Sequence, residues 1–244
     1  MYFDQREVDI RFEWGLSGLQ ALAPVSDVMI IVDVLSFTTC VDIVVANGGV
    51  VYPYRGEADA LPAFAESMGA LFAKPGRQHT TSFSLAPSSL TAAPEGTRLV
   101  LPSPNGSLLS LSTGTVPTLA GSLRNAGAVA GRAMQLGGRI SVIAAGERWR
   151  DGLLRPALED LLGAGAIISH LQGRRSPESG LAVAGFLDAQ SRLLDTLRHC
   201  GSGKELVGRG FEEDVRLAGQ LDISRAAPLL VDGAYQSEGQ DHDI

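Results

Sequence analysis

The segment DVMIIVDVL, residues 27–35, decides the fold class. Apart from its two aspartates it is apolar and largely β-branched, so a strand formed here would be buried on both faces. Such strands are typical of parallel sheets that helices cover on either side. The serine and threonines that follow, in SFTT (36–39), can cap a helix, and Asn47-Gly48 is a helix-stop signal. Residues 27–47 therefore predict a strand followed by a helix.

The same alternation continues along the chain. Further predicted strands are 50–54, 97–103, 116–121 and 139–146, and the predicted helices that follow them are 56–70, 105–113, 122–136 and 155–172. Residues 7–14 alternate as an edge strand would, and 228–232 are a last predicted strand. This pattern predicts an α/β fold with a largely parallel or mixed central sheet covered on both faces. We expect one domain over residues 1–235, mainly helical from about residue 178, and a disordered tail at 236–244.

Composition excludes several function classes. Of the 244 residues, 45% are hydrophobic and 19% charged, as in a globular protein. The net charge of -7 argues against a nucleic-acid partner. No apolar run approaches the roughly 20 residues that span a bilayer, and the polar N-terminus is no signal peptide. The two cysteines have neither metal nor redox spacing. We therefore expect a cytoplasmic protein without membrane partners.

Polar residues gather where the predicted strands end. In open α/β sheets, ligands bind outside the carboxyl ends of the strands. The candidates at these ends are Asp33, Ser103, Asn105, Ser107, Arg124, Asn125, Glu147 and Arg148. Asn105-Gly106-Ser107 also begins a helix, where free backbone N–H groups favour an anion. Carboxylates beside serine, asparagine and arginine suit a hard cation such as Mg²⁺ that holds a phosphate.

Structural interpretations of these residues stay open. Asp33 is equally consistent with a carboxylate paired to a neighbouring arginine or helix end. The sequence SPNG (103–106) is also an ordinary turn followed by a helix cap, and Arg155 with Glu159 has the spacing of a simple i, i+4 pair. Familiar phosphate-handling motifs are absent: there is no P-loop, no nucleophile elbow, and Leu35 replaces the second acid of an aspartyl-phosphate strand.

Five motifs in order carry a family resemblance. They are VDVLSFTT (32–39), SPNGS (103–107), GSLRNAGAVA (121–130), AAGERW (144–149) and ALEDLLGAGAI (157–167). Together they make the chain similar to the 2-phosphosulfolactate phosphatase family. The resemblance implies a three-layer α/β/α fold and Mg²⁺-dependent hydrolysis of 2-phospho-3-sulfolactate to 3-sulfolactate, a step towards coenzyme M. It also implies a small phosphorylated hydroxy acid as partner and a possible homodimer.

The resemblance assigns expected roles to the candidates. Asp33, Glu147 and Glu159 are expected to be catalytic, and these three with Asp160 to bind the metal. The expected substrate- or phosphate-binding residues are Ser36, Thr38, Asn105, Gly106, Ser107, Arg124, Asn125 and Arg148. The small residues of the GAGA segment (163–166) are expected to let their helix lie close to the sheet.

The chain departs from the family motif at several places. The first motif usually reads VDVLRATT, and Ser36 and Phe37 stand where that motif has arginine and alanine. AKPGRQ (73–78) and LAPSS (85–89) replace two further family segments. Loss of an anion-binding arginine at position 36 predicts a preference for substrates with a neutral tail. It also leaves an alternative function open, a non-catalytic binder of an anionic metabolite or nucleotide on the same fold.

Overall fold

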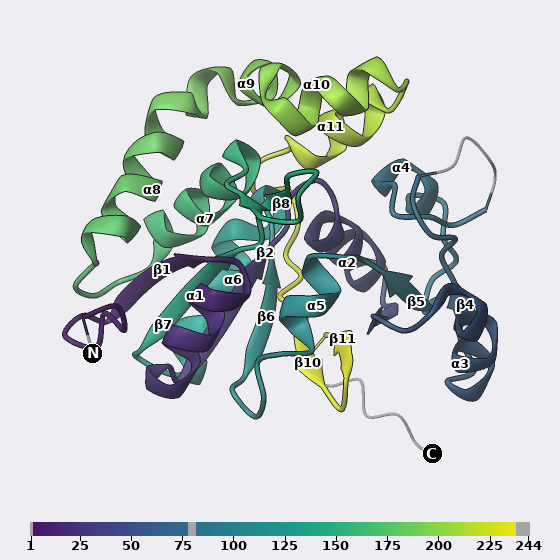
Figure 1. Ribbon diagram of the computed structural model, residues 1–244, viewed down its shortest axis with the longest axis horizontal. Coiled ribbons are helices and arrows are strands. Elements are labelled where there is room, and N and C mark those ends of the chain that lie inside the picture. The colour runs from purple at the N-terminus through teal and green to yellow at the C-terminus, as the bar shows by residue number, and fades with distance from the viewer. Residues whose placement is uncertain (1, 78–81, 238–244) are drawn as a thin grey trace.

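A central sheet organises the chain. The computed structural model describes residues 2–77 and 82–237, and within them the sheet has nine strands in the order β1-β7-β2-β6-β10-β11-β3-β5-β4 (Figure 1). The strands are β1 (Ile10–Trp14), β2 (Val28–Val32), β3 (Val50–Tyr54), β4 (Leu71–Phe72), β5 (Arg98–Pro102), β6 (Thr118–Gly121), β7 (Ile140–Ala144), β10 (Leu229–Val231) and β11 (Ala234–Gln236). The predicted edge strand and last strand are confirmed as β1 and β10.

The sheet consists of two parallel groups joined by a hairpin. Strands β1, β7, β2 and β6 pair in parallel, and so do β3, β5 and β4. The hairpin β10–β11 lies between them and pairs antiparallel with β6 through Leu229 and with β3 through Tyr235. The sheet is therefore mixed and mostly parallel, which confirms the predicted class.

Strand β2 shows why both faces need helices. All five of its residues are buried. Val28, Ile30 and Val32 join the core formed with α6 (Ala126–Leu136), α7 (Leu158–His170) and α8 (Pro177–Ala189). Met29 and Ile31 pack instead against α1 (Gly15–Leu22) and α5 (Gly106–Ser110). Because side chains alternate along a strand, one continuous apolar segment supplies both cores.

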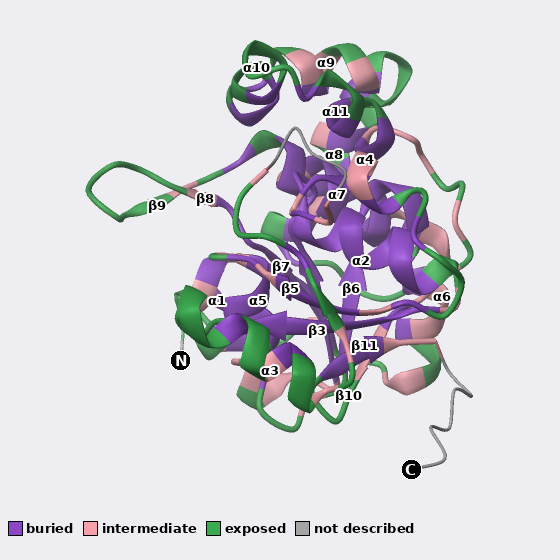
Figure 2. Cartoon of the chain, turned by 90° about the vertical axis from the view of Figure 1, so that its right-hand side faces the viewer, coloured by how far each residue is buried: buried purple, intermediate pink, exposed green. Residues whose placement is uncertain are grey.

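The helices form a layer on each side of the sheet. Helices α2 (Phe37–Ala46), α6, α7 and α8 cover one face, and α1, α3 (Leu61–Ser67) and α5 cover the other (Figure 2). Gly163 lets α7 approach β2, because a Cβ there would lie 2.6 Å from Cγ2 of Val34. The expected close approach of the GAGA helix is thus confirmed, and the three-layer α/β/α fold with it.

The C-terminal third adds mainly helices. Helix α8 begins at Pro177, next to the predicted boundary, and α9 (Leu193–His199), α10 (Gly201–Gly208) and α11 (Glu212–Ala218) follow. A short helix, α4 (Pro87–Leu90), packs beneath α11. Strand β11 includes Gln236, one residue beyond the predicted domain end, and residues 238–244 of the predicted tail lie outside the described residues. Among the described residues, no helix is long and apolar enough to cross a membrane.

Candidate active site

Four carboxylates from separate elements form an acidic cluster, Asp33, Glu147, Glu159 and Asp160. Asp33 follows β2, Glu147 begins the short strand β8 (Glu147–Arg148) after β7, and Glu159 and Asp160 lie in the first turn of α7. Asp33, Glu159 and Asp160 are buried and Glu147 is half-buried. Burial, and after it repulsion by a neighbouring carboxylate, raises the pKa of Asp33, Glu147 and Asp160. The structure thus brings together the four residues that the sequence predicted.

Asp160 joins the two loops that carry the cluster. Its Oδ1 accepts a hydrogen bond from the backbone N–H of Val34 at 2.8 Å, and its Oδ2 accepts one from Gly146 at 2.8 Å. Burial, followed by the charge of Asp33, raises the pKa of Asp160 well above its usual value. Because both oxygens already bind the backbone, the contacts favour a role for Asp160 in positioning the loops after β2 and β7.

Asp33 is a carboxylate whose ionisation lies near neutral pH. Burial raises its pKa to about 7, with the charge of Glu147 as the second cause. Hydrogen bonds from the backbone N–H groups of Phe37 and Gly106, and the charge of Arg77, oppose that rise. A carboxylate with such a pKa can hold or release a proton under ordinary conditions, as a general base must.

Glu147 is held by the loop after β5. Nδ2 of Asn105 donates a hydrogen bond to Oε2 of Glu147 at 3.0 Å. Burial raises the pKa of Glu147, and so does the charge of Glu159. Asn105 is therefore a predicted site residue that the structure does bring to the acidic cluster, although it contacts a carboxylate there.

The other polar groups of the predicted phosphate loop fasten the backbone. The hydroxyl of Ser107 donates to the carbonyl of Leu101 at 3.0 Å and accepts from the N–H of Tyr54 at 3.2 Å. The N–H of Gly106 points to the hydroxyl of Ser103 and to Asp33. Helix α5 thus directs its first N–H group at a carboxylate, so the expected anion site on these groups gains no support from the contacts.

Thr38 also serves the loop after β2. Its hydroxyl donates to the carbonyl of Asp33 at 2.9 Å and accepts from the N–H of the same residue at 3.1 Å. The side chain is fully buried. These bonds hold Asp33 just before α2, so the contacts favour a role for Thr38 in positioning Asp33.

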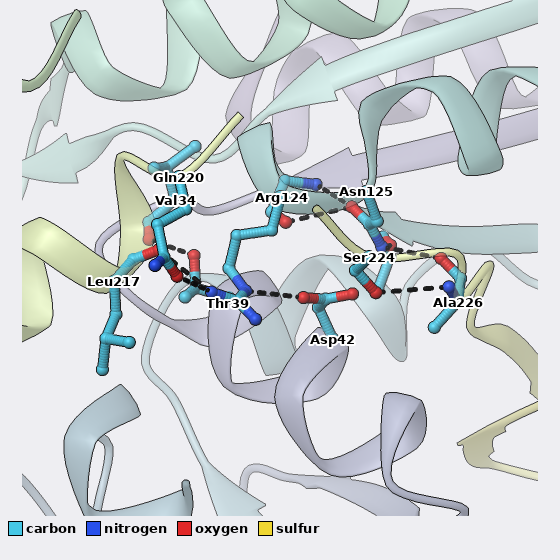
Figure 3. Close-up of polar contacts among 11 residues, drawn as sticks. Val34, Thr39, Asp42, Arg124, Asn125, Leu217, Gln220, Ser224 and Ala226 are labelled. Atoms are coloured by element: carbon cyan, nitrogen blue, oxygen red, sulfur yellow. Dashed lines mark hydrogen bonds and ion pairs between the residues drawn. The ribbon is translucent and has the colours of Figure 1, made fainter. Parts of the chain in front are cut away.

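Arg124 and Asn125 lie away from the acidic cluster, contrary to the expectation that they bind phosphate. Nε of Arg124 lies 2.7 Å from Oδ2 of the buried Asp42, and its Nη1 donates to Leu217 and Gln220 (Figure 3). Asn125 caps its own 3₁₀ turn and donates from Nδ2 to the carbonyl of Ala226 at 3.2 Å. Both side chains tie the C-terminal segment to α2 and the sheet.

Arg148 belongs to an exposed hairpin. It is exposed, and its Nη1 donates to the carbonyl of Gly152 at 2.9 Å within the turn between β8 and β9 (Leu154–Arg155). Among the described residues Arg148 makes no hydrogen bond or ion pair with the acidic cluster, and its expected role in binding phosphate stays a prediction. Arg155, in contrast, donates to the hydroxyl of Ser202 at 3.0 Å and its charge opposes the raised pKa of Glu147. It contacts α10 and does not form the expected i, i+4 pair.

The sequence singled out Arg77, with Arg148, as an arginine that could take over the role of the one missing at position 36, and the structure adds Asp214 and Cys200 as candidates. Nη2 of Arg77 donates to Oγ of Ser36, and Nε of Arg77 lies 3.5 Å from Oδ2 of Asp214. The thiol of Cys200 donates to Oε2 of Glu159 at 3.3 Å. Arg77 lies within AKPGRQ, a segment that departs from the family pattern.

Comparison with known proteins decides the family. A family model for 2-phosphosulpholactate phosphatases matches residues 19–233. The chain belongs to the 2-phosphosulfolactate phosphatase family. The expected membership of this family is therefore confirmed.

Individual relatives of this family differ in how much they share. A 2-phosphosulfolactate phosphatase of Methanothermobacter thermautotrophicus is 34% identical over 143 residues, which cover 58% of this chain and 59% of that protein. A probable 2-phosphosulfolactate phosphatase of Thermotoga petrophila is 26% identical over 223 residues, which cover 88% of this chain and 95% of the relative. The chain thus matches less than two thirds of the first relative's length.

The carboxylates of the acidic cluster are compatible with Mg²⁺ only if one or two of them bind the ion. Within the described residues, no three His, Cys, Asp or Glu side chains form a group ready to hold an ion. Mg²⁺, however, is usually bound by one or two carboxylates, with water and substrate phosphate completing the shell. The charge of Glu147 raises the pKa of Asp33 and that of Glu159 raises the pKa of Glu147, and a cation beside them would oppose both effects. These two residues would hold the ion, with Glu159 nearby.

Proposed function

We propose that this protein hydrolyses the phosphate monoester of a small 2-hydroxy acid, with 2-phospho-3-sulfolactate as the substrate class that the family suggests. The observation that carries the proposal is the pair Asp33 and Glu147, held by separate loops at one edge of the sheet. The pKa of about 7 for Asp33 gives this pair a group able to take a proton at neutral pH. The family membership supplies the reaction class.

The residues suggest how the reaction proceeds. Water attacks phosphorus in line as the P–O bond to the hydroxy acid breaks; Asp33 accepts the proton of that water, and the departing oxygen takes a proton from solvent. Asn105 orients Glu147 through its 3.0 Å hydrogen bond, and Asp160 fixes the two loops relative to each other. A bound Mg²⁺ would neutralise charge on the phosphate oxygens and on the departing oxygen.

Metal dependence is the first prediction. Phosphate release from a panel of 2-phosphorylated hydroxy acids should fall to background in excess EDTA and return when Mg²⁺ is added beyond the chelator. The reason is that Asp33 and Glu147 repel each other unless a cation offsets their charge. Turnover unchanged in EDTA would exclude the metal. Absence of turnover with every substrate, while the same acids bind in calorimetry, would support the alternative function of a non-catalytic anion binder.

The pH dependence is the second prediction. If ionised Asp33 is the base, kcat/KM in the free enzyme should rise as pH passes through about 7 and level off above it. Added Mg²⁺ should move the midpoint to lower pH, because a cation favours the carboxylate. The measurement is a rate profile from pH ~5 to ~9 at several Mg²⁺ concentrations. A profile that stays flat from pH ~5 to ~9 at the lowest Mg²⁺ concentration that supports turnover would rule out Asp33 as the base.

The raised pKa of Asp33 also has a consequence for stability. The folded-state value of about 7 exceeds the ordinary value of 3.8. The stabilising contribution of protonated Asp33 is therefore complete below the ordinary value and is lost as pH rises through about 7. Urea unfolding of wild type and Asp33→Asn across this range should show the two curves separating, with the variant less affected by pH.

A further inference from the structure

Arg77 places an almost buried positive charge beside the loop after β2. Its side chain is only 11% exposed, although it belongs to an irregular segment between β4 and α4. Nη2 donates to Oγ of Ser36, the residue at the position where the family motif has an arginine. Arg77 therefore places a guanidinium beside position 36, although it comes from another part of the chain.

Asp214 on α11 holds this arginine in place. The carboxylate of Asp214 is completely buried, and its Oδ2 lies 3.5 Å from Nε of Arg77. Its Oδ1 accepts the backbone N–H of Ser88, in α4, at 2.9 Å. Through this ion pair α11 reaches the edge of the acidic cluster and holds the guanidinium of Arg77.

The guanidinium of Arg77 has unused hydrogen-bonding capacity. Among the described residues, Nε of Arg77 and Oδ2 of Asp214 are buried without a hydrogen-bond partner, because 3.5 Å exceeds hydrogen-bond geometry for this pair. A buried donor without an acceptor is costly, and arginine presents its N–H groups as a fork that matches an oxyanion. The charge of Arg77 also acts on Asp33 and Glu147. Nε is directed at Asp214, whereas the charge of Arg77 reaches Asp33 and Glu147, so the guanidinium lies beside the neighbourhood in which a substrate would react.

We propose that Arg77 binds the acid group of the substrate other than the phosphate, a sulfonate or a carboxylate, and that Asp214 positions it. The inference rests on the proposed function for the identity of the substrate. If the bound group is the sulfonate, it reverses the expectation that Ser36 leaves the chain with a preference for neutral tails. A purely structural ion pair with Asp214 is the competing interpretation, and it gives no reason for the hydrogen bond to Ser36 or for the unsatisfied Nε.

The test compares binding and turnover in matched variants. Arg77→Met alone leaves Asp214 buried and unpaired, so Arg77→Met with Asp214→Asn is the main variant and Arg77→Lys is the variant that keeps the charge without the fork. Arg216→Met is the control, because Arg216 is an exposed arginine paired with Glu213 on the same helix as Asp214. Substrates are 2-phosphosulfolactate and 2-phospholactate.

Arg77→Met with Asp214→Asn should raise KM about 10- to 100-fold and change kcat much less. A loss confined to phosphosulfolactate means that the bound group is the sulfonate, and an equal loss for both substrates means that it is the carboxylate. Ser36→Arg combined with Arg77→Ser should recover part of the loss. Two outcomes would overturn the proposal. One is an unchanged KM in a folded variant, and the other is a variant whose only change is weaker inhibition by inorganic phosphate.

Calorimetry separates this inference from the proposed function. Titration with 3-sulfolactate and with lactate measures how tightly the acid group binds, because neither compound has a phosphate to hydrolyse. If no substrate is hydrolysed but sulfolactate binds wild type and not the Arg77→Met, Asp214→Asn variant, the hydrolysis proposal fails and the role of Arg77 stands. If turnover is normal and sulfolactate affinity is equal in the two proteins, the role of Arg77 fails alone.

Discussion

Asp33→Asn should lower kcat for phosphate release by about 10²- to 10⁴-fold, the usual contribution of a general base. The amide is similar in size to the carboxylate and can still accept one of the backbone hydrogen bonds from Phe37 or Gly106. It cannot accept a proton from water, and it offers a weaker ligand to a cation. The loss should therefore appear in kcat, with the fold intact.

Two measurements distinguish this loss from damage to the fold. Asp188→Asn is the control, because Asp188 is an exposed aspartate in a surface pair with Arg192, and its rate should equal that of wild type. Above pH 7 the Asp33→Asn protein should be at least as stable as wild type in urea, since ionised Asp33 is disfavoured by burial. A variant that keeps near-normal kcat would remove Asp33 from the reaction and leave Glu147 as the candidate base.

The layers of the fold were predictable where one segment determines its own environment. The apolar run of β2 requires cover on both faces whatever the rest of the chain does, and the alternation in β1 marks an edge. The place of β10 and β11 between β6 and β3 was not predictable, because it depends on pairing between residues far apart in the chain. The short hairpin β8–β9 was missed for a different reason, because two-residue strands leave no periodicity.

The candidate site was also predictable only in part. The strand-end rule located Asp33, Asn105 and Glu147, because the carboxyl ends of neighbouring parallel strands share an edge. It gave the wrong neighbourhood for Arg124, which turns towards α2. A signal for that exists in the sequence: Asp42 stands inside the apolar helix FTTCVDIVVA, where a carboxylate requires a cationic partner. Arg77 was named as a candidate because the arginine at position 36 is missing, but its place beside Ser36 and Asp214 was not predictable, because it depends on contacts between segments far apart in the chain.

The structure and the sequence make opposite predictions for Arg124. Its guanidinium pairs with Asp42, which is completely buried, and burial raises the pKa of that carboxyl while Arg124 opposes the rise. Removal of one partner from a buried pair typically costs about 3–5 kcal/mol, because the other charge is left unpaired. In a chain of this size such a loss corresponds to a Tm lower by about 6–20 °C. Removal of an arginine that only binds phosphate at an open site would not lower Tm in this way.

Arg124→Met should therefore lower the free energy of unfolding by about 3–5 kcal/mol in urea, and Asp42→Asn added to it should recover much of that loss because no buried charge remains. The control is Arg139→Met, which breaks the exposed pair with Asp27 and should change stability far less. Kinetics complete the test: the folded fraction of Arg124→Met should keep the KM of wild type and its inhibition by inorganic phosphate. If stability is unchanged while phosphate inhibition weakens at least tenfold, Arg124 is a ligand of the phosphate. The ion pair with Asp42 would then be a resting arrangement that substrate replaces.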